Sequence, residues 1–244
     1  MEPSSRPVEI SVVAPVFDEE GNAEVLAREI AAAFAGRAYE MVFVDDASRD
    51  ATLARLTALK AELPTLRVVA HAKNAGQSRA TRSGILAARG EIIVTIDGDR
   101  QNDPADGPAL VDRLKAGGPD LALVAGRRAK RQDNASKRLA SRFGNGVRRR
   151  LLKDGVDDTG CGLKAFRRDA FLRLPYFDHV HRYIPALMLR EGYRVEQMDV
   201  GHRPRVAGAS KYTNLRRLWV SLWDLMGVMW LNARARDPGA AREI

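Results

Sequence analysis

The first hundred residues alternate short apolar runs with helical patterns, and this alternation restricts the fold more than any other feature. Four runs rich in β-branched residues have the length of buried strands: 10–14, 39–44, 66–71 and 91–96. Three segments between them have helical spacing: 19–34, 50–62 and 76–89. Strands that alternate with helices of this length form βαβ units, so the sequence predicts an α/β fold, with a mostly parallel sheet and helices on both faces.

The pattern becomes less regular after Gly107. Two further helices and two further strands are expected, at 108–116, 183–191, 120–125 and 194–200. Two more segments follow the helix at 108–116 and the strand at 120–125. Residues 127–150 contain ten Lys and Arg residues, and 157–168 is a Gly-rich segment typical of a ligand site. We expect one domain at 8–214 and a helix at 215–233, with disordered ends at 1–7 and 234–244.

The charge balance favours anionic partners. Lys and Arg number 40 against 31 Asp and Glu, a formal net charge of +9, which suits nucleic acid, nucleotide phosphates or acidic lipids. Cys161 is the single cysteine, so a disulfide framework is excluded and a small core residue is expected. His179 and His181 lack a third ligand at a recognisable spacing, which favours packing or hydrogen bonding over zinc. The apolar stretch 218–231 is shorter than the roughly 20 residues of a spanning helix, and no secretory signal is evident.

Acidic residues follow the predicted strands where an open α/β sheet binds its ligands. Asp97 and Asp99 flank a glycine after a buried strand, and alternate carboxylates of this kind can converge on one hard cation. Taken alone, the pattern is equally typical of a solvated turn. The Asp45-Asp46 pair after a neighbouring strand favours a nucleotide site with Mg²⁺ or Mn²⁺, and Gln101 is placed to assist the metal.

Several motifs together resemble family 2 glycosyltransferases, which have the GT-A fold. Four segments carry the resemblance in order and spacing: SVVAPVFDEEGN, VFVDDASRDAT, NAGQSRATRSGI and TIDGDRQNDP. A closer similarity, to the dolichol-phosphate mannosyltransferase-like branch that moves sugars onto polyisoprenyl phosphates, rests on five more elements: Gly126-Arg127-Arg128, Lys137-Arg138 with Ser141, Asp158 to Lys164, His202 to Arg205 and Gly208 to Tyr212. The resemblance covers roughly 10–212, and the joint occurrence of the motifs is specific although each is weak.

The resemblance implies an inverting, metal-dependent transfer of a hexose-type sugar from a GDP- or UDP-linked donor to a polyisoprenyl phosphate. It assigns the nucleotide sugar to Pro15, Phe17, Glu19, Asp45, Gly76, Asp97, Arg203, Arg205 and Lys211. It assigns the metal to Asp99 and Gln101 with Asp97, and the acceptor phosphate to Arg127, Lys137, Arg138 and Ser141. Asp97 and Asp99 are the expected catalytic carboxylates, together with Asp158 as a base or as the group that orients the acceptor.

The resemblance places the protein at the cytoplasmic face of a membrane, held by 215–231 or by a separate membrane subunit. The helix in this segment is suited either to the membrane interface or to packing on the core or a partner subunit. An alternative within the class is another acceptor, such as a polysaccharide or a glycerolipid. A more distant alternative is a basic nucleic-acid-binding protein, which the low aromatic content of 6% and the acids after the strands disfavour.

Overall fold

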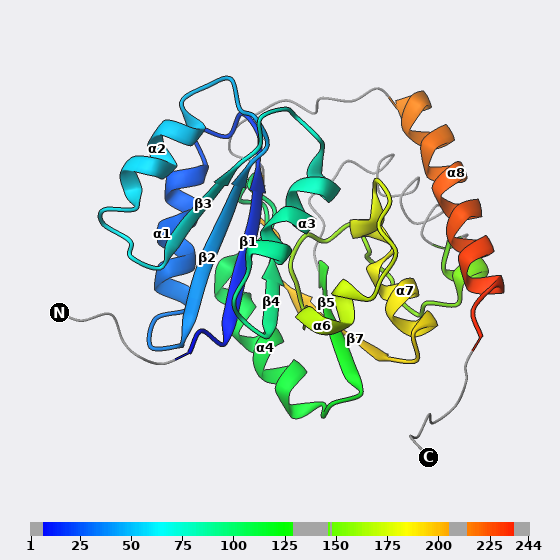
Figure 1. The fold of residues 1–244 in the computed structure, drawn as a ribbon. Helices are drawn as coiled ribbons and strands as arrows, with labels where there is room; N and C mark the ends of the chain where they lie inside the picture. Colours follow the sequence, from blue (N-terminus) through cyan, green and yellow to red (C-terminus); the bar gives the residue numbers. More distant parts are fainter. Residues whose placement is uncertain (1–6, 129–145, 147, 205–213, 237–244) are drawn as a thin grey trace, which may run out of the picture.

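The computed structural model describes residues 7–128, 146, 148–204 and 214–236 (Figure 1). The described residues form one seven-stranded sheet in the order β3-β2-β1-β4-β6-β5-β7. Its strands are β1 (Ile10–Val16), β2 (Tyr39–Asp45), β3 (Leu66–Ala70), β4 (Ile92–Thr95), β5 (Leu121–Arg128), β6 (Lys164–Arg167) and β7 (Arg194–Val200). Only β6 runs antiparallel to its described neighbours, β4 and β5, so the predicted mostly parallel sheet is confirmed.

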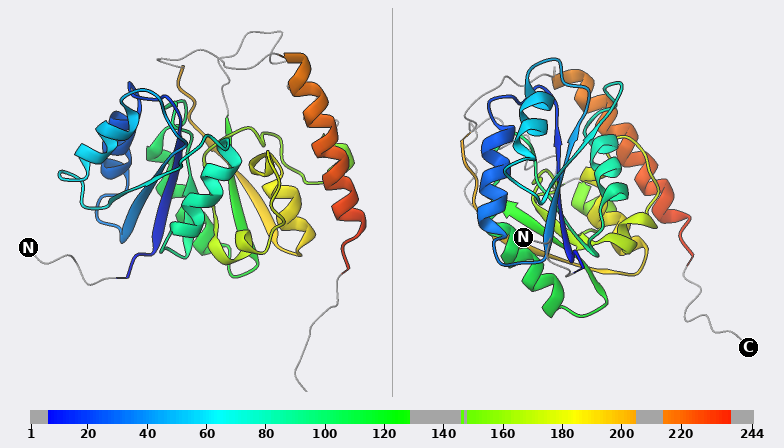
Figure 2. Two further views of the ribbon diagram at one scale, coloured as in Figure 1. Left: turned by 45° about the horizontal axis from the view of Figure 1, so that its top comes forward. Right: turned by 60° about the vertical axis from the view of Figure 1, so that its left-hand side comes forward.

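Helices cover both faces of the sheet, as predicted (Figure 2). They are α1 (Ala23–Ala33), α2 (Thr52–Leu59), α3 (Gln77–Ala87), η1 (Pro104–Asp106), α4 (Gly107–Ala116), α6 (Arg168–Leu172), η2 (Val180–Arg182), α7 (Ile184–Arg190) and α8 (Asn214–Ala233). The core on one face is built with α1, α2 and α4, and the core on the other face with α3, α6, α7 and α8. None of the helices in the part of the chain that the structure describes is long and apolar enough to cross a membrane.

Strand β1 shows why its sequence is continuously apolar. Val12 and Ala14 contribute to the core beneath α1 and α4, whereas Val13 contributes to the core beneath α3. All three side chains are at most 1% exposed. Successive side chains of a strand point to opposite faces, and here both faces are covered, so no position along the strand favours a polar residue.

The structure differs from the sequence-based expectation at residues 157–168. This Gly-rich segment ends in strand β6, which inserts between β4 and β5 and pairs Lys164 with Thr95. A four-residue strand is too short to show a recognisable alternation, and the preceding glycines obscure it further. Strand β5 also continues beyond the predicted end at Ala125 as far as Arg128, because it pairs along this length with β7.

Helix α3 packs unusually close to the sheet. A Cβ atom at Gly84 would lie 2.5 Å from Val13 Cγ1 and 2.9 Å from Val44 Cγ2. The glycine therefore lets the helix rest directly on β1 and β2, although glycine is a poor helix former. This contact fixes the position of the α3 N-terminus, where Gln77 enters the site described below.

Substitution by alanine at two helical glycines should consequently change the free energy of unfolding in opposite directions. Gly84→Ala should lower the free energy of unfolding by about 1–3 kcal/mol because the new methyl group overpacks the core. Gly227→Ala on α8 has nothing within 4 Å of its added Cβ, so the better helix propensity should stabilise by up to about 1 kcal/mol. Urea unfolding of both variants measures these changes, and a stabilised Gly84→Ala protein would contradict the packing described here.

Candidate active site

A cavity of about 550 Å³ lies at the carboxyl ends of the strands. Its lining comes from the ends of β1 and β4, the start of α3, the segment 159–164 and the residues around η2. Pro15, Phe17, Glu19, Gly76, Asp97, Asp99 and Gln101 all line it, as the sequence analysis expects of ligand-binding residues. Cys161 is buried in this wall and packs in the core, which confirms its predicted place.

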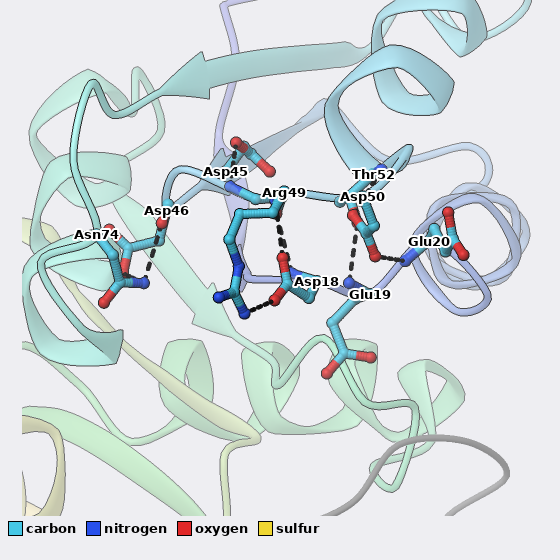
Figure 3. Close-up of polar contacts among 10 residues, drawn as sticks. Asp18, Glu19, Glu20, Asp45, Asp46, Arg49, Asp50, Thr52 and Asn74 are labelled. Carbon is cyan, nitrogen blue, oxygen red and sulfur yellow. Dashed lines mark hydrogen bonds and ion pairs between the residues drawn. The ribbon is translucent and has the colours of Figure 1, made fainter. Parts of the chain in front are cut away.

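Most acids in the loops after β1 and β2 bind neighbouring loop residues rather than facing one common point (Figure 3). The Asp18 carboxylate accepts hydrogen bonds from the Arg49 backbone, at 2.8 Å, and from its guanidinium, at 2.6 Å. Asp50 accepts from the backbone of Glu20 and from Thr52. Arg49 also lies 5.3 Å from the centroid of the Phe17 ring. These acids therefore fasten the two loops to each other, and they do not form the cation site that their number indicates.

Asp46 is fully engaged by the loop that leads into α3. Its carboxylate accepts from His71 Nδ1 at 2.7 Å and from Asn74 at 2.9 Å. It also accepts from the backbone N–H groups of Ala75 and Gly76, at 2.9 and 2.7 Å. Gly76 has a φ of 84°, a left-handed conformation that favours glycine. Asp46 thus shapes the turn at the cavity rim, a role that sequence reasoning did not assign.

Asp45 differs from its neighbour because half of its carboxylate has no partner. Oδ2 accepts from the Ser48 backbone at 3.1 Å, but Oδ1 is buried and has no hydrogen bond to any described residue. A buried acceptor without a partner is costly and calls for an explanation. An N–H donor from a bound base would satisfy Oδ1, which fits the role that the resemblance gives to Asp45, although Asp45 itself does not form part of the cavity lining.

Asp97 and Asp99 are brought into the same cavity at the end of β4. Asp97 Oδ1 accepts from Gln77 Nε2 at 2.7 Å, and Asp99 Oδ1 accepts from the Gln101 backbone at 3.2 Å. Burial, followed by the charge of Asp99, raises the pKa of Asp97 to about 6. A Cβ at Gly98 would lie 2.8 Å from Val16 Cγ1, so this glycine allows the loop to approach β1.

The donor set around Asp97 fits a divalent cation that phosphate oxygens complete. Within the described ranges, no group of three or more His, Cys, Asp or Glu side chains has a metal-binding arrangement. Mg²⁺ is commonly held by one or two carboxylates plus substrate phosphates, and Asp97, Asp99 and Gln101 provide two carboxylates and an amide oxygen. A cation near both carboxylates would also offset the burial and the charge of Asp99, which together raise the pKa of Asp97.

The other wall of the cavity carries positive charge. Arg128 forms a bidentate ion pair with Asp158, with N–O distances of 2.6 and 2.7 Å, and both side chains are largely buried. Lys164 is buried and donates to the carbonyl of Cys161, and burial lowers the pKa of its ammonium group. Asp158 therefore holds Arg128 in the wall, whereas the sequence analysis proposed it as a base or as an orienting group for the acceptor.

The structure places Arg128, rather than Arg127, at the cavity. Adjacent residues of a strand point to opposite faces, and Arg127 pairs instead with Asp199 at 2.6 Å and with Asp157 at 3.5 Å. A predicted strand that continued to Arg128 would have placed the two arginines on opposite faces. Lys164, Gln77 and Asp46 are further cavity residues that sequence reasoning did not assign to the site.

Arg203 lies outside the cavity lining and forms ion pairs with Glu29 at 3.0 Å and with Asp103 at 2.8 Å. The two carboxylates explain this position, because together they offer the guanidinium several acceptors. The remaining residues that the resemblance assigns to the donor or acceptor lie outside the described residues: Lys137, Arg138, Ser141, Arg205 and Lys211.

Residues 11–174 match the family described as glycosyl transferase family 2. The chain is 34% identical over 238 residues to the dodecaprenyl-phosphate galacturonate synthase of Rhizobium johnstonii, covering 95% of this chain and 70% of that protein. It is 36% identical over 224 residues to the undecaprenyl-phosphate 4-deoxy-4-formamido-L-arabinose transferase of Pseudomonas aeruginosa, covering 90% of this chain and 65% of that protein. The chain thus spans about two thirds of the length of these curated relatives.

Solved structures show the same fold. Glucosyl-3-phosphoglycerate synthase from Mycobacterium tuberculosis, solved with Mn²⁺, UDP-glucose and glycerol 3-phosphate, superposes with a TM-score of 0.68 at 23% identity, covering 95% of this chain and 82% of that one. The same enzyme has also been solved with Mg²⁺ and UDP, with a TM-score of 0.69 at 22% identity. The GT-A fold expected from the sequence is confirmed.

The raised pKa of Asp97 predicts how replacing this residue by asparagine changes the stability of the folded protein. The folded state binds the proton of Asp97 more tightly than the unfolded chain does. The stabilising contribution of the protonated carboxyl is therefore fully present below pH 4 and is lost as the pH rises through about 6. Asp97→Asn stays neutral at every pH, so it should raise the melting temperature of the metal-free protein at pH 8. Differential scanning calorimetry should show this gain shrinking towards pH 4, and an equal gain at both pH values would contradict the assignment.

Proposed function

Because this chain belongs to glycosyl transferase family 2, we propose that its cavity transfers a sugar from a nucleoside diphosphate donor to a polyisoprenyl phosphate. The observation that carries the proposal is one cavity lined both by the carboxylates of Asp97 and Asp99 and by the cations Arg128 and Lys164. The first group suits the metal-bound diphosphate of a donor, and the second suits an acceptor that is itself a phosphate. The two curated relatives described above are both named for polyprenyl phosphates, which supports this acceptor class.

The donor would occupy the part of the cavity next to β1 and β2. Phe17 and Pro15 border the nucleoside there, and the unpartnered Oδ1 of Asp45 accepts an N–H of the base. Asp99 and Gln101, with Asp97, would hold Mg²⁺ or Mn²⁺ together with the diphosphate. When bound, the metal supplies positive charge to the leaving diphosphate. Gln77 keeps the Asp97 carboxylate oriented through its 2.7 Å hydrogen bond.

The reaction then needs positioning more than proton removal. A phosphate oxygen of the acceptor attacks the anomeric carbon from the face opposite the leaving group, and the bond from that carbon to the donor's β-phosphate oxygen breaks. The nucleoside diphosphate leaves with the bond's electron pair, and the sugar is inverted. The second pKa of a phosphate monoester is about 6, so the attacking oxygen carries no proton near neutral pH. Asp158 is accordingly free to orient Arg128 rather than to act as a base.

Helix α8 provides a surface for peripheral membrane contact. Its inward side places Val228 in the core and Asp224 against His179. Its outward side is exposed and apolar, and contains Trp219, Leu222, Trp223, Met226, Met229 and Trp230. The three tryptophans are 60–69% exposed, and tryptophan is enriched at membrane interfaces. The helix thus turns Asp224 towards the protein and leaves an apolar face exposed, part of which lines a groove with Leu151. An exposed apolar face is what binding at a membrane interface requires.

The donor class should be visible as thermal stabilisation by a nucleoside diphosphate. In a panel of UDP, GDP, CDP and TDP, each with and without Mn²⁺, one nucleotide should raise the melting temperature, and more so with metal. Asp99→Asn should remove the metal-dependent part and leave the unliganded melting temperature within a few degrees. The absence of any shift in the wild-type protein would overturn the proposed donor site.

Membrane contact should depend on the outward tryptophans of α8. Trp223→Ser should reduce binding to liposomes at least several-fold, because it removes one large apolar side chain from the interface. Trp219→Ser and Trp230→Ser should add to this loss when combined with it. Arg113→Ser, at a half-buried ion pair on α4, is the control. Vesicle co-sedimentation measures binding, and full binding by the triple serine variant would exclude α8 as the contact surface.

A further inference from the structure

We infer that Arg182 binds the phosphate of the acceptor, and that helix α8 positions Arg182 through the segment Tyr176 to Tyr183. This inference rests on the proposed function, and it adds a binding residue that the motifs do not assign. Arg182 is the last residue of η2 and lines the same cavity as Asp97, Arg128 and Lys164. Its fork of N–H donors matches the geometry of phosphate oxygens.

Two other cations of the cavity wall also form hydrogen bonds within the protein. Arg128 directs two nitrogens to Asp158, at 2.6 and 2.7 Å. Lys164 is buried, and its ammonium group donates to the carbonyl of Cys161. These groups give that wall of the cavity a positive potential. Arg182 enters the cavity from a different element, next to α7, so it adds a cation from a second side.

The segment that carries Arg182 is fastened to α3 on one side. His181 Nδ1 lies 2.7 Å from Ser78 Oγ, in the first turn of α3. Burial, with the nearby charge of Arg182, keeps the pKa of His181 well below its usual value. The ring of Tyr176 lies under the guanidinium of Arg79, 3.9 Å from its centroid. Gln77 of the same helix turn contacts Asp97. The contacts of His181 and Tyr176 with α3 therefore hold the segment that carries Arg182 in a fixed position relative to the Asp97 carboxylate.

The same segment is fastened to α8 on the other side. His179 Nδ1 donates to Asp224 at 3.0 Å, and Tyr183 Oη donates to the Ser221 carbonyl at 3.3 Å. His179 adopts a left-handed φ of 64°, which is unfavourable for a residue with a side chain and marks a constrained turn. Arg182 therefore sits between two residues, His181 and Tyr183, that are bound to different helices. Docking of α8 should fix the direction in which its guanidinium extends.

The test uses farnesyl phosphate, a short water-soluble polyisoprenyl phosphate. Its affinity is measured calorimetrically with the protein saturated by Mn²⁺ and the nucleoside diphosphate that stabilises it most. Arg182→Ala should weaken farnesyl phosphate binding by about tenfold or more, the expected effect of losing charge-assisted hydrogen bonds, while stabilisation by the nucleotide stays unchanged. Arg182→Lys should recover part of the loss. Arg173→Ala, an exposed arginine at the end of α6, is the matched control and should bind as the wild type does.

The positioning role of α8 is tested by a double-mutant cycle. Asp224→Ala should weaken farnesyl phosphate binding in the wild-type background and have little further effect when Arg182 is already alanine. Asp224→Asn, which keeps a hydrogen-bond acceptor for His179, should have a smaller effect, and circular dichroism checks that α8 stays folded. Equal losses in both backgrounds would overturn the link between α8 and Arg182.

Two further outcomes separate this inference from the proposed function. If wild-type protein binds farnesyl phosphate and Arg182→Ala binds it equally well, Arg182 is not a phosphate ligand and the proposed function stands. If wild-type protein binds the nucleotide but no farnesyl phosphate, the proposed acceptor class is wrong and the inference fails with it. Farnesol serves as the uncharged probe: its binding should be weaker than that of farnesyl phosphate in the wild type and unchanged in Arg182→Ala.

Discussion

Two carboxylates share one partly buried cavity, and the burial of Asp97, to which the charge of Asp99 adds, is the constraint on which the rest of the site depends. Asp97 and Asp99 follow the same strand, and the Asp97 carboxyl has its pKa raised to about 6 by burial and by its neighbour. A Cβ at Gly162 would lie 2.3 Å from the Asp97 carboxyl group, so the chain approaches it as closely as a glycine allows. The fold keeps an unfavourable charge in place, which is typical of a site whose stabilising partner is a ligand.

Other charged groups near the cavity hold parts of the chain in place through several hydrogen bonds each. Asp46 shapes the turn into α3 through four hydrogen bonds, and Asp158 holds Arg128 through two. In helix α8, Asp224 is likewise bound within the protein, to His179, whereas the tryptophans of this helix are exposed. An apolar surface and a polar anchor on one helix can link the membrane contact proposed for this helix to the geometry of the cavity.

The sequence was sufficient to predict the parallel core of the fold and the carboxylate end of the site, because both follow from local patterns. The apolar run of β1 and the glycine between Asp97 and Asp99 can be recognised without knowing the pairing of distant residues. The short antiparallel β6, the choice between Arg127 and Arg128 and the engagement of Arg203 with Glu29 all depend on which segments become neighbours. The same holds for α8, whose inward face is fixed by His179 and Tyr183 rather than by its own periodicity.

Mass spectrometry of the lipid product tests most directly whether the cavity joins a sugar to a polyisoprenyl phosphate. The purified protein is incubated with Mn²⁺, undecaprenyl phosphate and each member of a panel of nucleoside diphosphate sugars. For at least one donor we predict a lipid that is heavier than the acceptor by the mass of one sugar less one water, formed together with an equal amount of free nucleoside diphosphate. Release of nucleoside diphosphate without any glycosylated lipid, or no reaction with every donor while a polysaccharide or glycerolipid acceptor is glycosylated, would contradict it.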